Sequence, residues 1–358
     1  MKAGLITFHS VYNYGANLQA LALQTYINRE ICECEIIDFV PNNVSVGRPR
    51  GVRGVLSFGK RCAMKCIRSF RPDKAYKMER FQARHYRLST RTYYGDRDVY
   101  ANPPQYDLLI SGSDQILNTT LSGCSETYYL KPWGNDIKKI SYASSFGREN
   151  VSESEYLLIR SELGKFAAIS ARENSGARML SSELNREIPM VVDPVFLLDR
   201  SEWIGLATKT RENGNYVFAY AMEYSDAMCS VLQRVIAEGK KVLLICGGES
   251  ARRLPGEIIK TAGPDEFLSH IANAELVITN SFHGTAFSII FEKPFISVAH
   301  LTRNARIESI LDLIGSSEKM ITSAENGELS DYVIDGREVI SSVLPLIKKS
   351  KDYLKQNC

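Results

Sequence analysis

The sequence has no long hydrophobic run and no clustered metal ligands, and each absence excludes a class of protein. Its apolar stretches are strand-sized, well short of the roughly 20 residues that a membrane-spanning helix needs. None of its eight cysteines forms a Cys-x-x-Cys pair, and its five histidines do not cluster with them, so we predict no metal site. The first residues enter an apolar segment without a basic n-region or a cleavage signal. We therefore expect a cytoplasmic protein that is not exported.

Excess positive charge is confined to one segment. Residues 48–97 contain fifteen Lys and Arg against three acidic residues, whereas acidic residues outnumber basic ones in the rest of the chain. Two specific interpretations are docking on an anionic membrane surface and binding of nucleic acid, and the third is a solvated insertion. Because no recognised nucleic-acid reading motif accompanies the charge, we expect no nucleic-acid partner. We favour the membrane surface.

The chain alternates between short apolar segments and helical patterns, which predicts α/β structure with parallel sheets. Its 358 residues favour two domains, and a polar interval at 208–215 separates two α/β series. We predict an N-terminal domain at 1–207 with a basic insertion at 48–97, a C-terminal domain at 208–335 and a helix at 336–358. Strands are expected at 5–8, 35–40, 106–111, 139–143, 167–171 and 190–193, then at 216–220, 241–245, 275–279 and 294–298.

The segment Thr279-Asn-Ser-Phe-His-Gly-Thr285 follows an apolar strand and precedes an apolar helix expected at 286–291. A helix start offers unpaired N–H groups and a positive dipole potential, which suit a phosphate or carboxylate. Gly284 lets a ligand approach the backbone, Thr285 adds a hydroxyl, and His283 can donate a proton to a ligand there. The alternative is that Ser281 merely caps the helix and His283 packs inside the domain.

Other strand ends carry charged residues. Arg172 can grip a carboxylate or phosphate with two hydrogen bonds, or instead form a plain ion pair with Glu173. Asp114 and Asp193 are candidate bases, although Asp193 can also simply end a strand before a proline. These residue types suit a reaction that needs an acid, a base and a cation for an anionic group.

The first strand is followed by Asn13-Tyr-Gly-Ala-Asn17, which has the composition of a ligand-facing turn. Tyr14 can stack on a sugar ring, and Asn13, Asn17 and Gln19 can bond hydroxyl groups. The alternative is a loop held by asparagine turns, with Gln19 on a solvated helix face.

Six segments in order resemble the polysaccharide pyruvyl transferase family across about 300 residues, from Met1 to near Val298. They are Asn13-Tyr-Gly-Ala-Asn-Leu-Gln-Ala20, Ser111-Gly-Ser-Asp-Gln115, Tyr142-Ala-Ser-Ser-Phe-Gly147, Ser170-Ala-Arg-Glu-Asn-Ser175, Val192-Asp-Pro-Val195 and the Thr279 segment continued to Phe287. Any one of them alone is weak, whereas six in the same order are specific.

The resemblance implies two Rossmann-like domains facing a cleft, as in GT-B glycosyltransferases, with the acceptor on the N-terminal domain and the donor on the C-terminal one. It implies a pyruvyltransferase that moves the enolpyruvyl group of phosphoenolpyruvate onto two hydroxyls of a sugar. The product is a pyruvate ketal in capsular or exopolysaccharide biosynthesis. Phosphoenolpyruvate is then a co-substrate, with no further cofactor. The acceptor is a lipid-linked glycan precursor, and the protein is peripheral at the inner face of the cell membrane.

The resemblance implies that His283 and Arg172 hold the donor, and the residue chemistry described above supplies the other site candidates. The catalytic candidates are His283, Arg172, Asp114 and Asp193. The donor-binding candidates are Arg172, Asn280, Ser281, His283, Gly284 and Thr285, and the acceptor-binding candidates are Asn13, Tyr14, Gly15, Asn17, Gln19, Ser113, Asp114 and Gln115. Some family members carry an arginine where this chain has Ser281. The missing cation is therefore expected from Arg252, Arg253 or Arg303.

Two other functions remain open at this point. One is a GT-B-type glycosyltransferase with a nucleotide-sugar donor, which uses the same architecture. The other is a non-catalytic glycan-binding or scaffold protein in a polysaccharide assembly complex.

Overall fold

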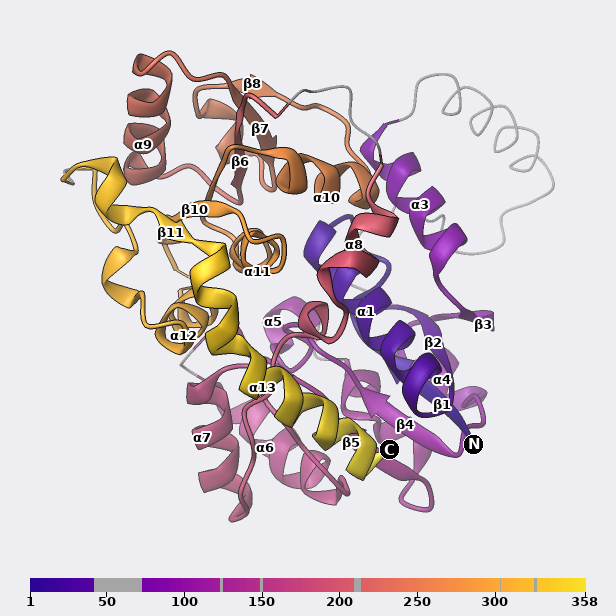
Figure 1. Ribbon diagram of the computed structural model, residues 1–358. Helices are drawn as coiled ribbons and strands as arrows, with labels where there is room; N and C mark the ends of the chain where they lie inside the picture. Colours follow the sequence, from indigo (N-terminus) through magenta and orange to yellow (C-terminus); the bar gives the residue numbers. More distant parts are fainter. Residues whose placement is uncertain (42–72, 123–124, 149–150, 209–213, 303, 325–326) are drawn as a thin grey trace, which may run out of the picture.

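The computed structural model describes residues 1–41, 73–122, 125–148, 151–208, 214–302, 304–324 and 327–358. It contains two α/β domains, each built on its own sheet (Figure 1). The N-terminal sheet has the order β3-β2-β1-β4-β5 and all its pairings are parallel. Its strands are β1 (Lys2–Ile6), β2 (Glu33–Val40), β3 (Leu88–Tyr94), β4 (Leu108–Ser111) and β5 (Lys138–Ser141). The predicted two-domain α/β architecture is confirmed.

The C-terminal sheet has the order β11-β10-β9-β6-β7-β8, and only the edge strand β11 runs antiparallel to its neighbour. Its strands are β6 (Val217–Ala221), β7 (Val242–Cys246), β8 (Glu257–Ile258), β9 (Leu276–Thr279), β10 (Pro294–Ser297) and β11 (Ile334–Asp335). The parallel order brings the carboxyl ends of β6, β7, β9 and β10 to one edge, which is where ligands bind in such sheets.

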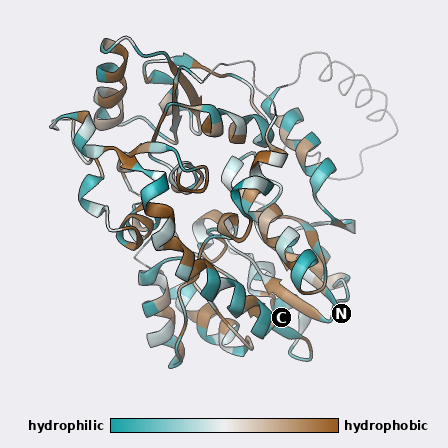
Figure 2. Cartoon of the chain, viewed as in Figure 1, coloured by the Kyte–Doolittle hydropathy of each residue, from teal (hydrophilic) through white to brown (hydrophobic). Residues whose placement is uncertain are grey.

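Helices cover the sheets, and the apolar residues gather in the strands and on the inner helix faces (Figure 2). The N-terminal domain carries α1 (Tyr14–Glu30), α3 (Lys74–His85), α4 (Asp96–Ala101), α5 (Thr119–Ser122), α6 (Glu153–Ser161), α7 (Asn174–Leu184) and α8 (Arg200–Leu206). The C-terminal domain carries α9 (Asp226–Ala237), α10 (Pro264–Asn273), α11 (Phe282–Ile290) and α12 (Ala305–Leu313). Within the described residues, no helix combines the length and the apolar character required to cross a membrane.

Two sequence expectations need correction. The segments expected as strands at 167–171 and 190–193 form only isolated parallel bridges, in which Ala168 pairs with Ile140 and Ala171 with Ser144 and Met190. Prolines at 189 and 194 remove the amide donors that a longer ladder needs. Of the predicted basic insertion, residues 48–72 lie outside the described part of the chain. The part from 74 onward is no insertion, since it forms α3, the edge strand β3 and the start of α4.

The last helix, α13 (Gly336–Asn357), starts beside the C-terminal sheet and runs back across the N-terminal domain (Figure 1). The Tyr353 hydroxyl donates to the Ser141 carbonyl at 2.8 Å. The amide of Val192 donates to Ser350 Oγ at 2.9 Å, immediately before Asp193. The end of the chain therefore supports the strand ends of the first domain.

Candidate functional site

A cavity of about 320 Å³ lies between the two domains, at the carboxyl edge of both sheets. Most of its lining residues come from the β1–α1 segment, from the segment after β4, and from the starts of α11 and α12, while Met222 and His300 follow β6 and β10. They are Phe8, Val11, Asn13, Ala16, Asp114, Gln115, Leu121, Met222, Asn280, Ser281, Phe282, His283, His300, Arg306 and Ile307. The topology thus brings together most of the segments in which the sequence places site residues.

The start of α11 projects into this cavity. The helix begins at Phe282, four residues before the expected start, so His283 lies in its first turn rather than in the preceding loop. Ser281 is the N-cap residue, but its side chain makes no capping hydrogen bond. This contradicts a purely capping role for Ser281, and it leaves first-turn N–H groups for an anion. A Cβ atom on Gly284 would lie 2.3 Å from Thr279 Oγ1, so this position requires glycine.

Behind the cavity, Arg172 is embedded among carboxylates from three chain segments. Its Nη1 lies 2.5 Å from Asp193 Oδ2, its Nε 3.3 Å from Glu173 Oε1 and its Nη2 3.6 Å from Asp114 Oδ1. Ser113 Oγ lies 3.5 Å from both Asp193 Oδ2 and Arg172 Nη1. The arginine charge lowers the pKa of Asp114 in spite of burial, which works in the opposite direction.

Asp114 has an unusual backbone, with φ of 75°. This left-handed conformation costs energy for most side chains but is tolerated by Asp and Asn. It is stabilised by a hydrogen bond from the Gln115 amide to Asp114 Oδ1, at 2.9 Å. The strained turn aims the carboxylate at Arg172 and the cavity.

His283 faces the same carboxylates. Its Nε2 lies 3.7 Å from Asp193 Oδ2 and has no hydrogen-bond partner among the described residues. Burial lowers the pKa of His283 to about 4, outweighing the attraction of Asp193 and Asp114. The imidazole is therefore neutral at pH 7 when no anion is bound. Gly15 packs against it so closely that a Cβ atom there would lie 2.0 Å from His283 Nδ1.

Arg306, on the first turn of α12, is the cation that the sequence reasoning missed. Its side chain is 15% exposed and its Nη1 lies 3.9 Å from Asp114 Oδ1. Burial, followed by the nearby Arg172 charge, lowers its pKa to about 10. Of the three expected cations, Arg252 is an exposed partner of Glu249 and Arg303 is outside the described residues.

Arg253 does not have the expected role either, because its guanidinium lies over the Tyr224 ring, 4.4 Å from the ring centroid. The sequence offered one signal for Arg306, namely a basic residue soon after the strand end at Val298. Only the orientation of α12 about its own axis shows that this residue lines the cavity.

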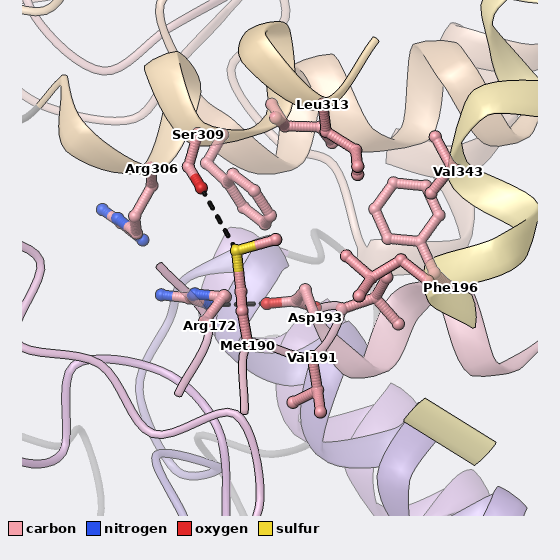
Figure 3. Close-up of a pocket in the computed structure, with 13 residues that line it drawn as sticks. Arg172, Met190, Val191, Asp193, Phe196, Arg306, Ser309, Leu313 and Val343 are labelled. Atoms are coloured by element: carbon pink, nitrogen blue, oxygen red, sulfur yellow. Dashed lines mark hydrogen bonds and ion pairs between the residues drawn. The ribbon is translucent and has the colours of Figure 1, made fainter. Parts of the chain in front are cut away.

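Figure 3 shows how the two site arginines lie relative to a second, small cavity of about 30 Å³. Both guanidinium groups are on the same side of Met190, while apolar side chains such as Phe196 and Val343 fill the other side. Met190 Sδ contacts Ser309 Oγ on α12 at 3.8 Å. The arginines thus lie against an apolar wall, which keeps their charges away from bulk water on that side.

The residues expected to bind the acceptor separate into two groups. Asn13 and Gln115 line the cavity, and Gln115 Oε1 is buried without a hydrogen-bond partner in the described chain. Asn13 also caps α1 by accepting a hydrogen bond from the Ala16 amide. Asn280, which was expected to bind the donor, lines the cavity too, and its Oδ1 accepts a hydrogen bond from the Met222 amide at 2.7 Å.

Tyr14, Asn17 and Gln19 instead have structural contacts. Tyr14 is 1% exposed, stacks on Phe267 with ring centroids 4.7 Å apart and donates to the carbonyl of Ala262. Its ring is therefore not open to a sugar, contrary to the expected stacking. The amide of Asn17 is hydrogen-bonded to Gln82, Tyr86 and two backbone carbonyls, and Gln19 Nε2 is bonded to the Thr7 hydroxyl at 2.9 Å.

Comparison with known proteins gives both a family and a fold. A sequence model of the polysaccharide pyruvyl transferase family matches residues 13–302. None of the curated protein sequences matches significantly. Among solved structures, UDP-GlcNAc 2-epimerase from Methanocaldococcus jannaschii, in complex with UDP-GlcNAc and UDP, has a TM-score of 0.56 at 12% identity, covering 99% of both chains. UDP-GlcNAc 2-epimerase from Neisseria meningitidis has a TM-score of 0.51 at 10% identity, covering 99% of this chain and 93% of that one. These likenesses establish a GT-B-like fold.

Proposed function

Because the chain belongs to the polysaccharide pyruvyl transferase family, we propose that it transfers the enolpyruvyl group of phosphoenolpyruvate to two hydroxyls of a sugar, forming a pyruvate ketal. The observation that carries this proposal is the unpaired Nε2 of His283 beside Asp193 and close to an uncapped helix start, in a cavity that Arg306 also lines. A candidate acid, the Asp114 carboxylate and anion-binding groups thus line one cavity, and Asp193 lies behind His283.

The reaction needs two proton movements and one leaving group. A proton is added to C3 of the enol ether, and one sugar oxygen bonds to C2. The C2–O bond to phosphate then breaks, phosphate leaves with the bonding electrons, and the second sugar oxygen closes the ketal. Of the two hydroxyl protons, one is balanced by the proton gained at C3 and the other leaves with phosphate.

We assign His283 as the acid that protonates C3. A neutral imidazole is a poor acid, but a bound anion raises its pKa because it favours the charged form. Asp114 and Asp193 are the acceptors for the hydroxyl protons, and both are connected to Arg172. Asn13 and Gln115 orient the acceptor from the N-terminal side of the cavity. The first-turn amides of α11, with Gly284 and Thr285, face the donor.

The acceptor in this proposal is a lipid-linked glycan precursor, with the protein held at the inner face of the cell membrane. The support is the exposed basic side chains that α3 and the following turn carry, at Arg80, Arg84 and Arg87, together with the basic composition of residues 48–72. Binding to vesicles containing anionic lipid at low salt tests this part. A protein that ignores such vesicles acts on an acceptor brought to it in solution.

The decisive assay is release of inorganic phosphate from phosphoenolpyruvate in the presence of lipid-linked galactosides and related sugars. We expect release that depends on the sugar and disappears in His283→Ala. Retained activity in that variant would remove His283 from its assigned role. UDP- and CMP-sugars are tested in parallel, and turnover of one of them with none of phosphoenolpyruvate would make the chain a glycosyltransferase.

A further inference from the structure

We infer that Arg306 is the residue that binds the anionic group of the donor directly, whereas Arg172 is a fixed part of the site's framework. The inference rests on the proposed function and identifies a binding residue for the same site. It follows from the very different surroundings of the two guanidinium groups.

Arg172 already has its partners. Its side chain is 2% exposed, with Asp193, Glu173 and Asp114 around it and the Phe282 ring 5.0 Å from its guanidinium carbon. Carboxylates on several sides hold the group and offset its charge. Only Nη2 lacks a hydrogen bond within the described residues. Such a group orients Asp193 and Asp114, and it has little capacity left for a ligand.

Arg306 has the opposite character. Its buried Nε has no hydrogen-bond partner in the described part of the chain. Its contact with Asp114, at 3.9 Å, is too long for a hydrogen bond. A buried charge without close partners is costly, and the neighbouring Arg172 charge repels it, which contributes to its lowered pKa. An anion placed at Arg306 would satisfy its N–H groups and offset that repulsion.

The surroundings indicate where this anion would lie. Arg306, His283 and Ser281 line the same cavity, which gives access from the uncapped start of α11 to the first turn of α12. A phosphate group suits this position, because planar guanidinium N–H groups and helix-start amides both match its oxygens. Asp114 is the competing anion, since it is the carboxylate nearest Arg306.

The test is titration of the full chain with sulfate and inorganic phosphate, followed by calorimetry. We expect Arg306→Met to weaken binding of both ions by about 10- to 100-fold, as loss of a hydrogen bond between charged groups does. Arg306→Lys keeps the charge but loses the planar guanidinium fork. Its affinity for both ions should therefore lie between that of the wild type and that of Arg306→Met. Arg252→Gln is the matched control in the same domain and should bind as the wild type does. Circular dichroism establishes that each variant is folded.

The outcomes separate this inference from the proposed function. Unchanged ion binding in folded Arg306→Met or Arg306→Lys overturns the inference. If phosphoenolpyruvate is turned over, Arg306→Met should raise KM for the donor more than it lowers kcat; an unchanged KM would overturn the inference while the proposed function stands. Arg306-dependent binding of both ions without turnover of phosphoenolpyruvate supports the anion site and refutes the function.

Discussion

The proposed acid, His283, should take up a proton when an anion binds. In the free protein its pKa is about 4, so almost none of it is charged near pH 6.5. A unit negative charge about 4 Å away contributes about 4 kcal/mol at an effective dielectric constant of 20, which corresponds to roughly 3 pKa units. That shift brings the pKa of His283 to about 7. Binding of an anion at pH 6.5 should therefore take up about 0.8 proton per site.

Calorimetry with sulfate measures this uptake directly, because sulfate itself does not titrate near pH 6.5. The binding enthalpy is determined in buffers of different ionisation enthalpy, and the slope gives the number of protons. His283→Gln should bind sulfate with a slope near zero. A slope near zero for the wild type, or an equal slope in both proteins, would refute the assigned titration.

The same residue gives a pH dependence of stability. A histidine whose folded pKa is lowered binds protons more readily in the unfolded chain, so stability is lost as the pH falls below about 6.5 towards 4. Between pH 7 and pH 5 this residue alone should reduce the free energy of unfolding by about 2 kcal/mol. Urea unfolding of the wild type and His283→Gln should show that difference in pH dependence.

Three further substitutions test the packing and charge of the site. Gly15→Ala should reduce kcat by about 100-fold, because the new methyl group displaces the His283 ring. Gly205→Ala is the control, since a Cβ atom at that position meets nothing within 4 Å. Equal rates in the two variants would contradict the predicted displacement of His283. Asp114→Asn keeps the backbone conformation and removes the carboxylate charge that competes with an anion for Arg306. It should tighten sulfate binding about tenfold in calorimetry and, because it removes a candidate base, slow transfer about 100-fold. Weaker sulfate binding would argue against competition between the carboxylate and the ligand. In urea unfolding, Tyr14→Phe should lower the free energy of unfolding by about 1 kcal/mol and Tyr14→Ala by about 3 to 5 kcal/mol. A stable Tyr14→Ala protein with a raised KM for the sugar would instead indicate that Tyr14 stacks on the sugar.

The strands and the polar residues that follow them could be predicted from the sequence. Apolar periodicity is a local signal that locates each strand, and in a parallel sheet the carboxyl ends of the strands all lie at the same edge. The segment around His283 is the clearest case. A buried strand followed by small and polar residues leads into a helix, and the helix start lies at the ligand edge. The exact start of the helix was not accessible, because Phe282 and His283 have ordinary helix propensity and tertiary packing decided the boundary.

Side-chain direction was less accessible. Tyr14 and Gln19 lie in the expected segment, but Tyr14 points to the other domain and Gln19 points inward, so neither lines the cavity. Arg306 shows the converse, since its side chain reaches the site only through the orientation of α12 across the domain interface. Such placements depend on how two domains meet, and no local pattern in either domain encodes that.

Because α13 packs back against the first domain, part of the support for that domain is synthesised late. Ser350 holds the amide next to Asp193, so the contact that fixes this carboxylate needs a residue made more than 150 positions later. Until this residue has been made, the N-terminal domain lacks that hydrogen bond. The cavity between the domains is likewise incomplete until the segment that contains His283 has been made. The N-terminal domain can therefore make its hydrogen bonds to Ser350 and Tyr353 only after α13 has been synthesised and has packed against it.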